Sequence, residues 1–294
     1  MHHKRSLLIA ISITGLMFVL EVIGGIISNS LALLSDAGHM LTDIFALSLS
    51  LFAVKFASMP ATEKKTYGFY RIEILTALIN GVVLILLVLY IFYEAYRRLI
   101  DPKEVKSLIM LVVASIGLIV NIAGAFILKG SSRENINIRS AFLHIIGDAL
   151  SSAGVIIGGI IIMATKWYVV DPLLSIAIGV VILRGAYGLV SESVNILLEA
   201  VPKGIRVDTV VGEVKRIDGV RDIHDVHIWT LTSGVYALSA HVLISDLLTS
   251  ESNKVLERIN GLLKEKFNIQ HTTIQFECEW CSNKDVCVLD SKPR

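Results

Sequence analysis

Residues 31–54 read LALLSDAGHMLTDIFALSLSLFAV, an apolar run whose only titratable side chains are Asp36, His39 and Asp43. The hydrocarbon core of a bilayer is about 30 Å thick, so a helix needs about 20 mostly apolar residues to cross it. This run is long enough. Titratable groups at membrane depth are costly and rare, which makes them candidate functional residues. The stretch therefore predicts a membrane-spanning helix that carries a polar site.

Other apolar runs of comparable length accompany this one. The runs cover residues 7–27, 31–54, 74–93, 108–128, 141–164 and 172–190. Over the whole chain 54% of the residues are hydrophobic and 18% are charged, whereas a soluble protein has about 25% charged residues. The first run lacks a small-residue cleavage site, so we expect a retained helix and not a cleaved signal. The predicted fold class is a membrane α-helical bundle of six transmembrane helices, followed by a smaller domain.

The composition changes after Glu199, because charges become frequent and no later run could span a bilayer. Apolar positions in this part recur first with the period of helices and then with the alternation of strands. The predicted elements are a helix at 207–217, strands at 223–231 and 236–244, a helix at 250–267 and a strand at 272–277. We therefore expect a transmembrane domain at residues 1–200 and a small cytosolic α+β domain at residues 201–294, of ferredoxin-like type with the order αββαβ.

The basic residues of the loops predict the orientation, since Lys and Arg are more frequent in cytosolic loops. They are more numerous before residue 7, at 55–73 and at 129–140 than in the other loops. Both termini are therefore expected in the cytosol. The net charge of +1 lacks the basic excess of a nucleic-acid-binding protein, so no nucleic-acid partner is expected.

Two of the apolar runs share the pattern Ser-x-x-x-His-x-x-x-Asp. The residues are Ser35, His39 and Asp43 in one run and Ser140, His144 and Asp148 in the other. A spacing of four places His and Asp on one helix face. The two helices cross in opposite directions, so His39 is expected near Asp148 and Asp43 near His144. Two imidazoles and two carboxylates suit tetrahedral zinc, whereas calcium and magnesium prefer oxygen shells of higher number and copper(I) prefers Cys or Met.

Other interpretations of these polar residues exist. One membrane His-Asp pair could be a structural hydrogen bond or a proton relay, but two pairs with identical spacing favour a binding site. Glu21 and Asp36 also lie in or near the spans. They could attract ions toward the site or face a wet cavity, and the sequence does not decide between these roles.

The C-terminal part holds a second group of potential ligands: His224, His227, His241, His271, Glu277, Cys278 and Cys281. His271 and Glu277 share one face of the last predicted strand, because side chains alternate with a period of two. Surface histidines are the alternative to a metal site here. Cys278 and Cys281 form a single Cys-x-x-Cys, which is an incomplete zinc site. Cys287, or His2 and His3, could complete it, although these two histidines could equally be solvated terminal residues.

Several motifs, in one order, resemble the cation diffusion facilitator family. They are DAGHMLTD at 36–43, TYGFYRIEIL at 66–75, HDVHIW at 224–229, LSAHV at 238–242 and HTTIQFE at 271–277. The resemblance extends from the first span to Glu277. It implies a homodimer, multi-pass in the cell (inner) membrane, that exports zinc from the cytosol in exchange for protons. Zinc would be the substrate and a structural or regulatory ligand, with no other cofactor and no enzymatic activity.

The resemblance also implies roles for particular residues. The transport site would comprise His39, Asp43, His144 and Asp148, and a His-Asp pair in the second span resembles the zinc-preferring members. The resemblance assigns regulatory zinc to His224, His241 and Glu277, and less directly to His271. Arg71 and Glu199 fall where related transporters place a charge pair at the membrane–cytosol junction of the dimer. The loop at 129–137 departs from the family's pattern, since it is short and has no histidine.

Three alternative functions remain. The first is proton-coupled transport of another cation, such as Cd²⁺, Co²⁺ or Fe²⁺. The second is a membrane metallohydrolase, which would need an open ligand position and a general base; the chain has no His-Glu-x-x-His motif. In the third, the tail is a metal sensor and the spans only anchor it.

Overall fold

The computed structural model of the chain describes residues 2–56, 62–129 and 136–279, and side chains at 12–42, 44–45, 48, 62–126 and 145–279. It divides into two compact units. The first comprises Met1–Ser58 with Thr76–Val190, and the second comprises Met59–Leu75 with Ser191–Arg294.

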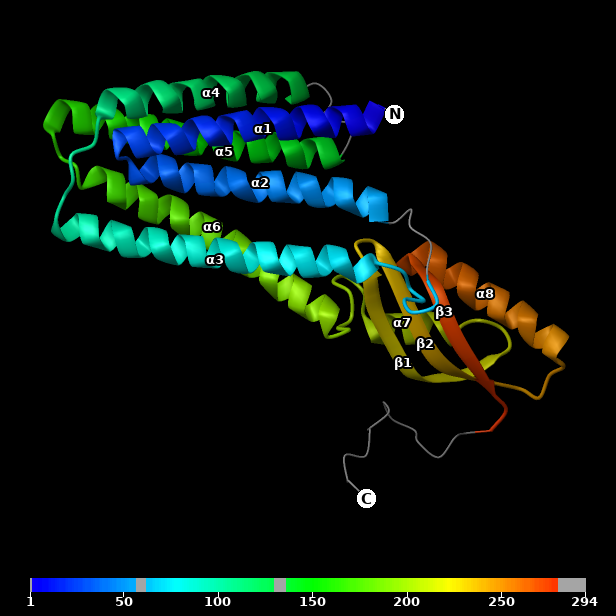
Figure 1. Cartoon of the computed structure of the whole chain (residues 1–294). Helices are drawn as coiled ribbons and strands as arrows, with labels where there is room; N and C mark the ends of the chain where they lie inside the picture. Colours follow the sequence, from blue (N-terminus) through cyan, green and yellow to red (C-terminus); the bar gives the residue numbers. More distant parts are fainter. Residues whose placement is uncertain (1, 57–61, 130–135, 280–294) are drawn as a thin grey trace. The chain divides into compact units, whose positions relative to one another are not determined.

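The first unit is a bundle of long helices (Figure 1). These are α1 (His2–Ser28), α2 (Leu31–Phe56), α3 (Tyr70–Ile100), α4 (Ser107–Lys129), α5 (Ile136–Thr165) and α6 (Val170–Leu197). Helix α4 packs along α5, and α1 packs on both α2 and α4. Glycines permit the close approach of helices. A Cβ added to Gly24 would lie 2.6 Å from a Val113 methyl carbon, and one added to Gly179 would lie 2.5 Å from the Phe92 ring.

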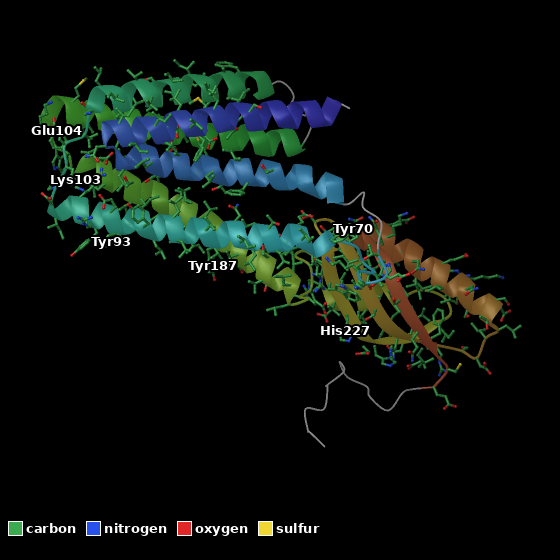
Figure 2. All side chains as sticks on the ribbon, in the orientation of Figure 1. Tyr70, Tyr93, Lys103, Glu104, Tyr187 and His227 are labelled. Atoms are coloured by element: carbon green, nitrogen blue, oxygen red, sulfur yellow. The ribbon has the colours of Figure 1, made fainter. Side chains whose placement is uncertain are left out.

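The outer surface of this bundle is apolar. Large side chains that would be buried in a soluble protein are exposed here, among them Leu16, Ile79, Tyr93, Phe126 and Tyr187; Figure 2 labels the two tyrosines. In the described part of the chain four helical segments are long and apolar enough to cross a membrane: Tyr70–Ile100, Ser107–Phe126, Ile145–Thr165 and Val170–Leu197. The predicted transmembrane helical domain is therefore confirmed, while the number of six spans stays a prediction.

The second unit contains the predicted mixture of helices and strands. Its elements are α7 (Val207–Val214), β1 (Val220–Thr232), β2 (Val235–Ile244), α8 (Thr249–Phe267) and β3 (Ile269–Glu277). Strands β1 and β2 are antiparallel, β2 and β3 are parallel, and the sheet order is β1-β2-β3. The predicted element order is confirmed, and the ferredoxin-like assignment stays a prediction.

The core of the second unit lies between the sheet and the two helices. Val210 of α7 and Ile259 of α8 join Leu238 and Val242 of β2 in one buried apolar cluster. Since side chains alternate along a strand, the odd-numbered residues of β2, including His241, point to the opposite face of the sheet. Turn residues fit their positions: Gly234 has φ +76° in the β1–β2 hairpin, and Asn268 has φ +55° after α8.

An ion pair at the edge of this core predicts a pH effect. Partial burial alone would raise the pKa of Asp222, but the Lys215 ammonium 2.5 Å away and the Ile223 N–H lower that pKa below its ordinary value of 3.8. A lowered pKa stabilises the fold above the unfolded value, and this contribution is lost as the pH falls through the folded value. We expect Asp222→Asn to lower the free energy of unfolding at pH 7 by at most about 1 kcal/mol.

The measurement is denaturant unfolding of the full chain, followed by circular dichroism at pH 7 and at pH below 3. The deficit of the variant should shrink as the pH falls through the lowered pKa of Asp222, where the wild-type carboxylate takes up a proton. The exposed Asp246→Asn is the control and should behave as wild type at both pH values. An Asp222→Asn deficit that is unchanged at low pH would contradict the assignment.

Candidate metal sites

The first candidate site lies where α2 meets α5. The His39 Nε2 atom of α2 lies 3.3 Å from the Asp148 Oδ1 atom of α5, and the two side chains are 27% and 20% exposed. The other two predicted ligands, Asp43 and His144, belong to the same two helices, but their side chains lie outside the described residues. The structure thus brings together one member of each His-x-x-x-Asp pair.

A cavity reaches this pair from one side. It measures about 380 Å³, lies between α2, α5 and α6, and has His39 in its wall. Most of the remaining wall is apolar, with Leu150, Leu174 and Ile178 among the lining residues, and Gly147 and Gly154 leave the space open. An imidazole that borders a cavity can exchange a bound ion or a proton, which a fully enclosed one could not.

The two acidic residues whose role the sequence left open are both buried. Asp36 of α2 accepts a hydrogen bond of 2.6 Å from the Ser151 hydroxyl of α5. Glu21 of α1 is buried in the same group of helices. Since Ser151 also lines the cavity beside His39, Asp36 belongs to the polar surroundings of the candidate site.

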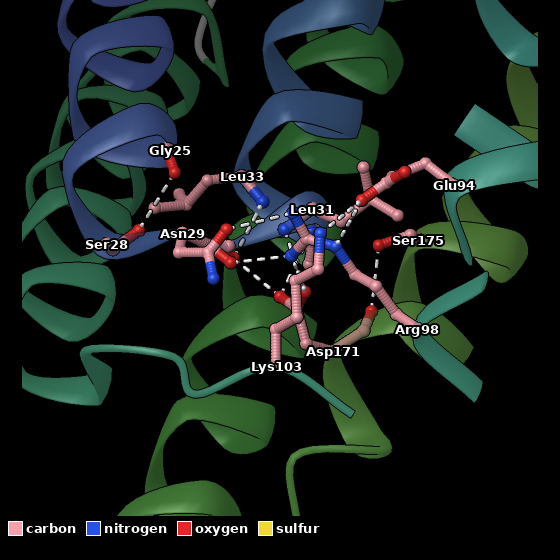
Figure 3. Close-up of polar contacts among 12 residues, drawn as sticks. Gly25, Ser28, Asn29, Leu31, Leu33, Glu94, Arg98, Lys103, Asp171 and Ser175 are labelled. Carbon is pink, nitrogen blue, oxygen red and sulfur yellow. Dashed lines mark hydrogen bonds and ion pairs between the residues drawn. The ribbon is translucent and has the colours of Figure 1, made fainter. Parts of the chain in front are cut away.

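A buried ionic network fixes the start of α2, and no local pattern predicts it (Figure 3). Asp171, near the start of α6, is fully buried and accepts a 2.6 Å hydrogen bond from the Ser30 hydroxyl. It also accepts bonds from the backbone N–H groups of Leu31 and Ala32, at 2.8 and 3.2 Å. The first N–H groups of a helix lack partners within the helix. Asp171 therefore caps α2 from another helix.

Arg98 of α3 completes this network. It donates hydrogen bonds to the backbone and side-chain oxygens of Asn29 at 2.6 and 3.0 Å. It also forms ion pairs with Glu94 at 3.1 Å and with Asp171 at 3.5 Å. His39 lies about 12 Å along α2 from Leu31, at a rise of about 1.5 Å per residue. The network therefore anchors the helix that carries His39 to both α3 and α6.

The second candidate site lies on the sheet face opposite α7 and α8. His224 of β1, His241 of β2 and Glu277 of β3 offer ligand atoms that all lie within 4.8 Å of one another. The His241 Nδ1 atom is 2.8 Å from one carboxylate oxygen of Glu277, and the His224 Nε2 atom is 3.3 Å from the other. Pairing of His224 with His241 across β1 and β2 brings the two rings together.

These three side chains suit a divalent transition metal. Two imidazoles and one carboxylate are a common three-ligand set for zinc. The Glu277 Oε2 atom is buried and has no hydrogen-bond partner among the described residues. Buried polar atoms normally have a partner, so a cation bound between Glu277 and the histidines would satisfy this oxygen.

Other predicted ligands of the tail lie apart from this group. His271 shares the face of Glu277, but it pairs with Ala237, while His241 pairs with Gln275. Four residues of strand separate the two levels, about 13 Å at about 3.3 Å per residue. The His271 ring instead contacts Tyr67, with centroids 5.5 Å apart. Cys278 is an exposed free thiol, and Cys281 and Cys287 lie outside the described residues.

Asp225 is a neighbour of this site that the sequence analysis did not select. It has φ +50° and lies where the β1–β2 register shifts between His224 and His227. Its carboxylate is 3.0 Å from His227 Nε2 and 3.9 Å from His241 Nε2. The irregular strand thus presents a further carboxylate beside His241. The HDVH sequence at residues 224–227 could have indicated this bulge, because Asp adopts the left-handed conformation more readily than most residues.

Arg71 and Glu199 form the predicted charge pair. The Arg71 guanidinium lies 2.7 Å from the Glu199 carboxylate, and both side chains are exposed to a large extent. Glu73, one turn from Tyr70 on α3, accepts hydrogen bonds from the hydroxyls of Thr232 and Ser233, the latter at 2.8 Å. The start of α3 is therefore bonded to the β1–β2 hairpin within the second unit.

Comparison with known families gives two matches, one over each of the two candidate metal sites. Residues 7–198 match the cation efflux transmembrane domain, and residues 202–279 match the cytoplasmic domain of cation efflux proteins. The chain belongs to the cation diffusion facilitator family. Together the two matches cover most of the chain, including both candidate metal sites.

Relatives of this cation diffusion facilitator carry names of metal transporters. It is 45% identical to the "Cadmium, cobalt and zinc/H(+)-K(+) antiporter" of Bacillus subtilis, over 98% of this chain and 93% of the relative. It is 42% identical to the "Metal cation efflux system protein CzcD" of Cupriavidus metallidurans, over 96% and 89%. It is 41% identical to the "Zinc transporter ZitB" of Pectobacterium atrosepticum, over 96% and 88%. The predicted family is therefore confirmed, and these relatives are transporters.

Proposed function

We propose that this cation diffusion facilitator exports zinc from the cytosol and takes up protons in exchange. The ion would bind at His39, Asp43, His144 and Asp148 and reach one side of the membrane at a time. The observation that carries this proposal is the 3.3 Å contact of His39 with Asp148, which joins an imidazole and a carboxylate from two helices of the transmembrane domain.

Exchange follows from the chemistry of these ligands. Zinc binds neutral imidazole and ionised carboxylate, so protons compete for the same atoms. A free imidazole changes charge near pH 6.5, where modest differences in pH across a membrane shift its occupancy. Loading zinc from the cytosol and protons from the other side would make one site serve both ions.

The printed names of the relatives support the cations and the counter-ion. ZitB is named for zinc, and the Bacillus subtilis relative is named for cadmium, cobalt and zinc together with H⁺ and K⁺. Transport of cadmium or cobalt by the same site is the second candidate. Two imidazoles and two carboxylates do not by themselves reject either ion.

We propose that the chain has six spans within residues 1–200, a cytosolic domain at residues 201–294, and both termini in the cytosol. The match of residues 202–279 to a cytoplasmic domain supports this orientation. A homodimer fits the same domain, and the Arg71–Glu199 pair would lie at its membrane–cytosol junction.

Transport into vesicles tests the proposal. Purified protein is reconstituted, and uptake of Zn²⁺, Cd²⁺, Co²⁺ and Fe²⁺ is measured with and without an opposing pH gradient and with and without potassium. We expect zinc uptake that the pH gradient accelerates. Protein that moves none of these ions would overturn the proposal, while uptake that follows potassium and ignores pH would replace the proton by K⁺.

We also propose that His224, His241 and Glu277 hold zinc in the cytosolic domain. Loss of a residue that only hydrogen-bonds a zinc ligand already lowers the zinc affinity of a site by about 10–100-fold. His241→Ala removes a ligand itself, so we expect a loss of more than about 100-fold at this site. Isothermal titration of the full chain should then count one fewer tight zinc per chain.

His227→Ala is the matched control for this variant, because His227 is a nearby histidine whose ring contacts Asp225 and lies outside the ligand group. It should bind as many zinc ions as the wild type. Unchanged binding by His241→Ala, or an equal loss in the control, would contradict the assignment.

A further inference from the structure

Glu21 carries a carboxyl group inside the helix bundle and is not one of the four proposed metal ligands. Its side chain belongs to α1 and the residue is 2% exposed. A Cβ placed on Gly117 of α4 would lie 3.2 Å from the Glu21 Oε1 atom and 3.5 Å from the Ser152 hydroxyl. The absence of a side chain at Gly117 therefore provides the space that the carboxyl group occupies, beside the hydroxyl of α5.

The second carboxyl oxygen of Glu21 accepts no hydrogen bond from the side chains that the structure describes. Oε2 is buried and has no partner in the described part of the chain. The charged groups that act on Glu21 are Asp36 from α2 and Asp148 from α5, both of the same sign. Residues 12–54, 107–128 and 145–165, which make up most of α1, α2, α4 and α5, contain no Lys or Arg. Among the described side chains, the charges that act on Glu21 are thus both acidic.

A buried carboxylate without a cation is strongly disfavoured in an apolar bundle. Glu21 must therefore carry a proton or lie beside a bound cation. The geometry favours the proton. Among the described residues, only His224, His241 and Glu277 bring three ligand atoms within 4.8 Å of one another, so Glu21, Asp36 and Asp148 do not form a compact metal cage. A single carboxyl oxygen that has no hydrogen-bond partner among the described residues is sufficient for one proton.

We propose that Glu21 is a proton-binding site of the transport cycle, separate from the metal ligands. It would hold a proton when the transport site is without zinc. A Zn²⁺ ion bound at His39 and Asp148 adds two positive charges on the side of Asp148, which favours the ionised form of Glu21. The proton then leaves to water, so one H⁺ from Glu21 accompanies each Zn²⁺ that binds at the transport site. This inference rests on the proposed exchange of zinc for protons.

Counting protons released on zinc binding tests this role. Full-chain protein in detergent and weak buffer is titrated with zinc, and the released protons are read with a pH indicator. Glutamine has the shape of a protonated glutamate, so Glu21→Gln should fold and bind the same number of zinc ions. We expect it to release about one proton fewer per chain than the wild type when all zinc sites are filled. Glu21→Asp should restore the wild-type count, which a merely structural role of Glu21 would not predict.

Two controls keep the result decisive. Glu104→Gln removes an exposed carboxyl and should release the wild-type number of protons. Glu21→Met is a second neutral variant of similar size, and it gives the same reading if the glutamine variant does not fold. An unchanged proton count in either folded neutral variant overturns the role of Glu21. A wild type that binds no zinc overturns the proposed function instead, so the two failures are distinguishable.

Discussion

Replacing Asp148 by alanine is expected to abolish zinc transport while leaving the protein folded. Asp148 lies 3.3 Å from His39, so the variant loses a proposed ligand and leaves the imidazole without this carboxylate. Replacing a residue that only hydrogen-bonds a zinc ligand typically lowers zinc affinity or activity by about 10–100-fold. Loss of a ligand should therefore lower zinc uptake by more than about 100-fold. The measurement is zinc uptake by reconstituted vesicles at saturating pH gradient.

His39→Ala should cause a loss of similar size, and the double variant should be little worse than either single one. Residues that act as one unit are not additive, because the first replacement already destroys the site. Ile157→Ala is the control, since Ile157 lies on the same helix with an exposed side chain and should leave uptake near the wild-type rate. Normal transport by both single variants would remove these residues from the transport site.

Asp171→Ala is expected to destabilise the membrane domain by about 3–5 kcal/mol, the usual cost of removing one partner of a buried ion pair. Arg98 would keep Glu94 as a partner, which favours the lower end of that range. The variant would also leave the first N–H groups of α2 without their acceptor. The measurement is unfolding of the detergent-solubilised protein in denaturant.

The control and the paired variant separate this network from general damage. Asp101→Ala removes an exposed aspartate at the end of α3 and should change stability by less than about 0.5 kcal/mol. In Asp171→Ala combined with Arg98→Met, no buried charge remains opposite the missing aspartate. The double variant should then lose less stability than the sum of the two single changes. A wild-type unfolding curve for Asp171→Ala would show that the network does not hold α2.

Helix lengths illustrate what apolar content can and cannot predict. The run at 74–93 predicted a span, whereas α3 extends over Tyr70–Ile100. The additional residues at its end include Glu94, Arg97 and Arg98, which hydropathy excludes from a span. Glu94 pairs with both arginines within the helix, at spacings of three and four residues. Such pairs and the contacts with Asn29 and Asp171 stabilise helical turns that no apolar count could find.

The sheet shows a similar limit. Alternation along the last predicted strand placed His271 and Glu277 on one face, and His241 was expected only on a neighbouring strand. Only the register separates them: β3 runs parallel to β2, with Gln275 opposite His241. Register depends on how whole strands pack on the helices, so a single sequence does not determine which residues on one face are close.

By itself, the sequence determined the family, the apolar helices, the αββαβ tail and the two His-x-x-x-Asp pairs. The family followed from the resemblance of several motifs in one order. The others depend on spacing within one segment, and helix and strand periods translate spacing directly into a shared face. Tertiary structure alone decided the contact of His39 with Asp148, the group of His224, His241 and Glu277, the Asp171–Arg98 network and the isolation of Glu21. These arise between segments far apart in the chain, where the packing of helices and the register of strands decide which groups meet.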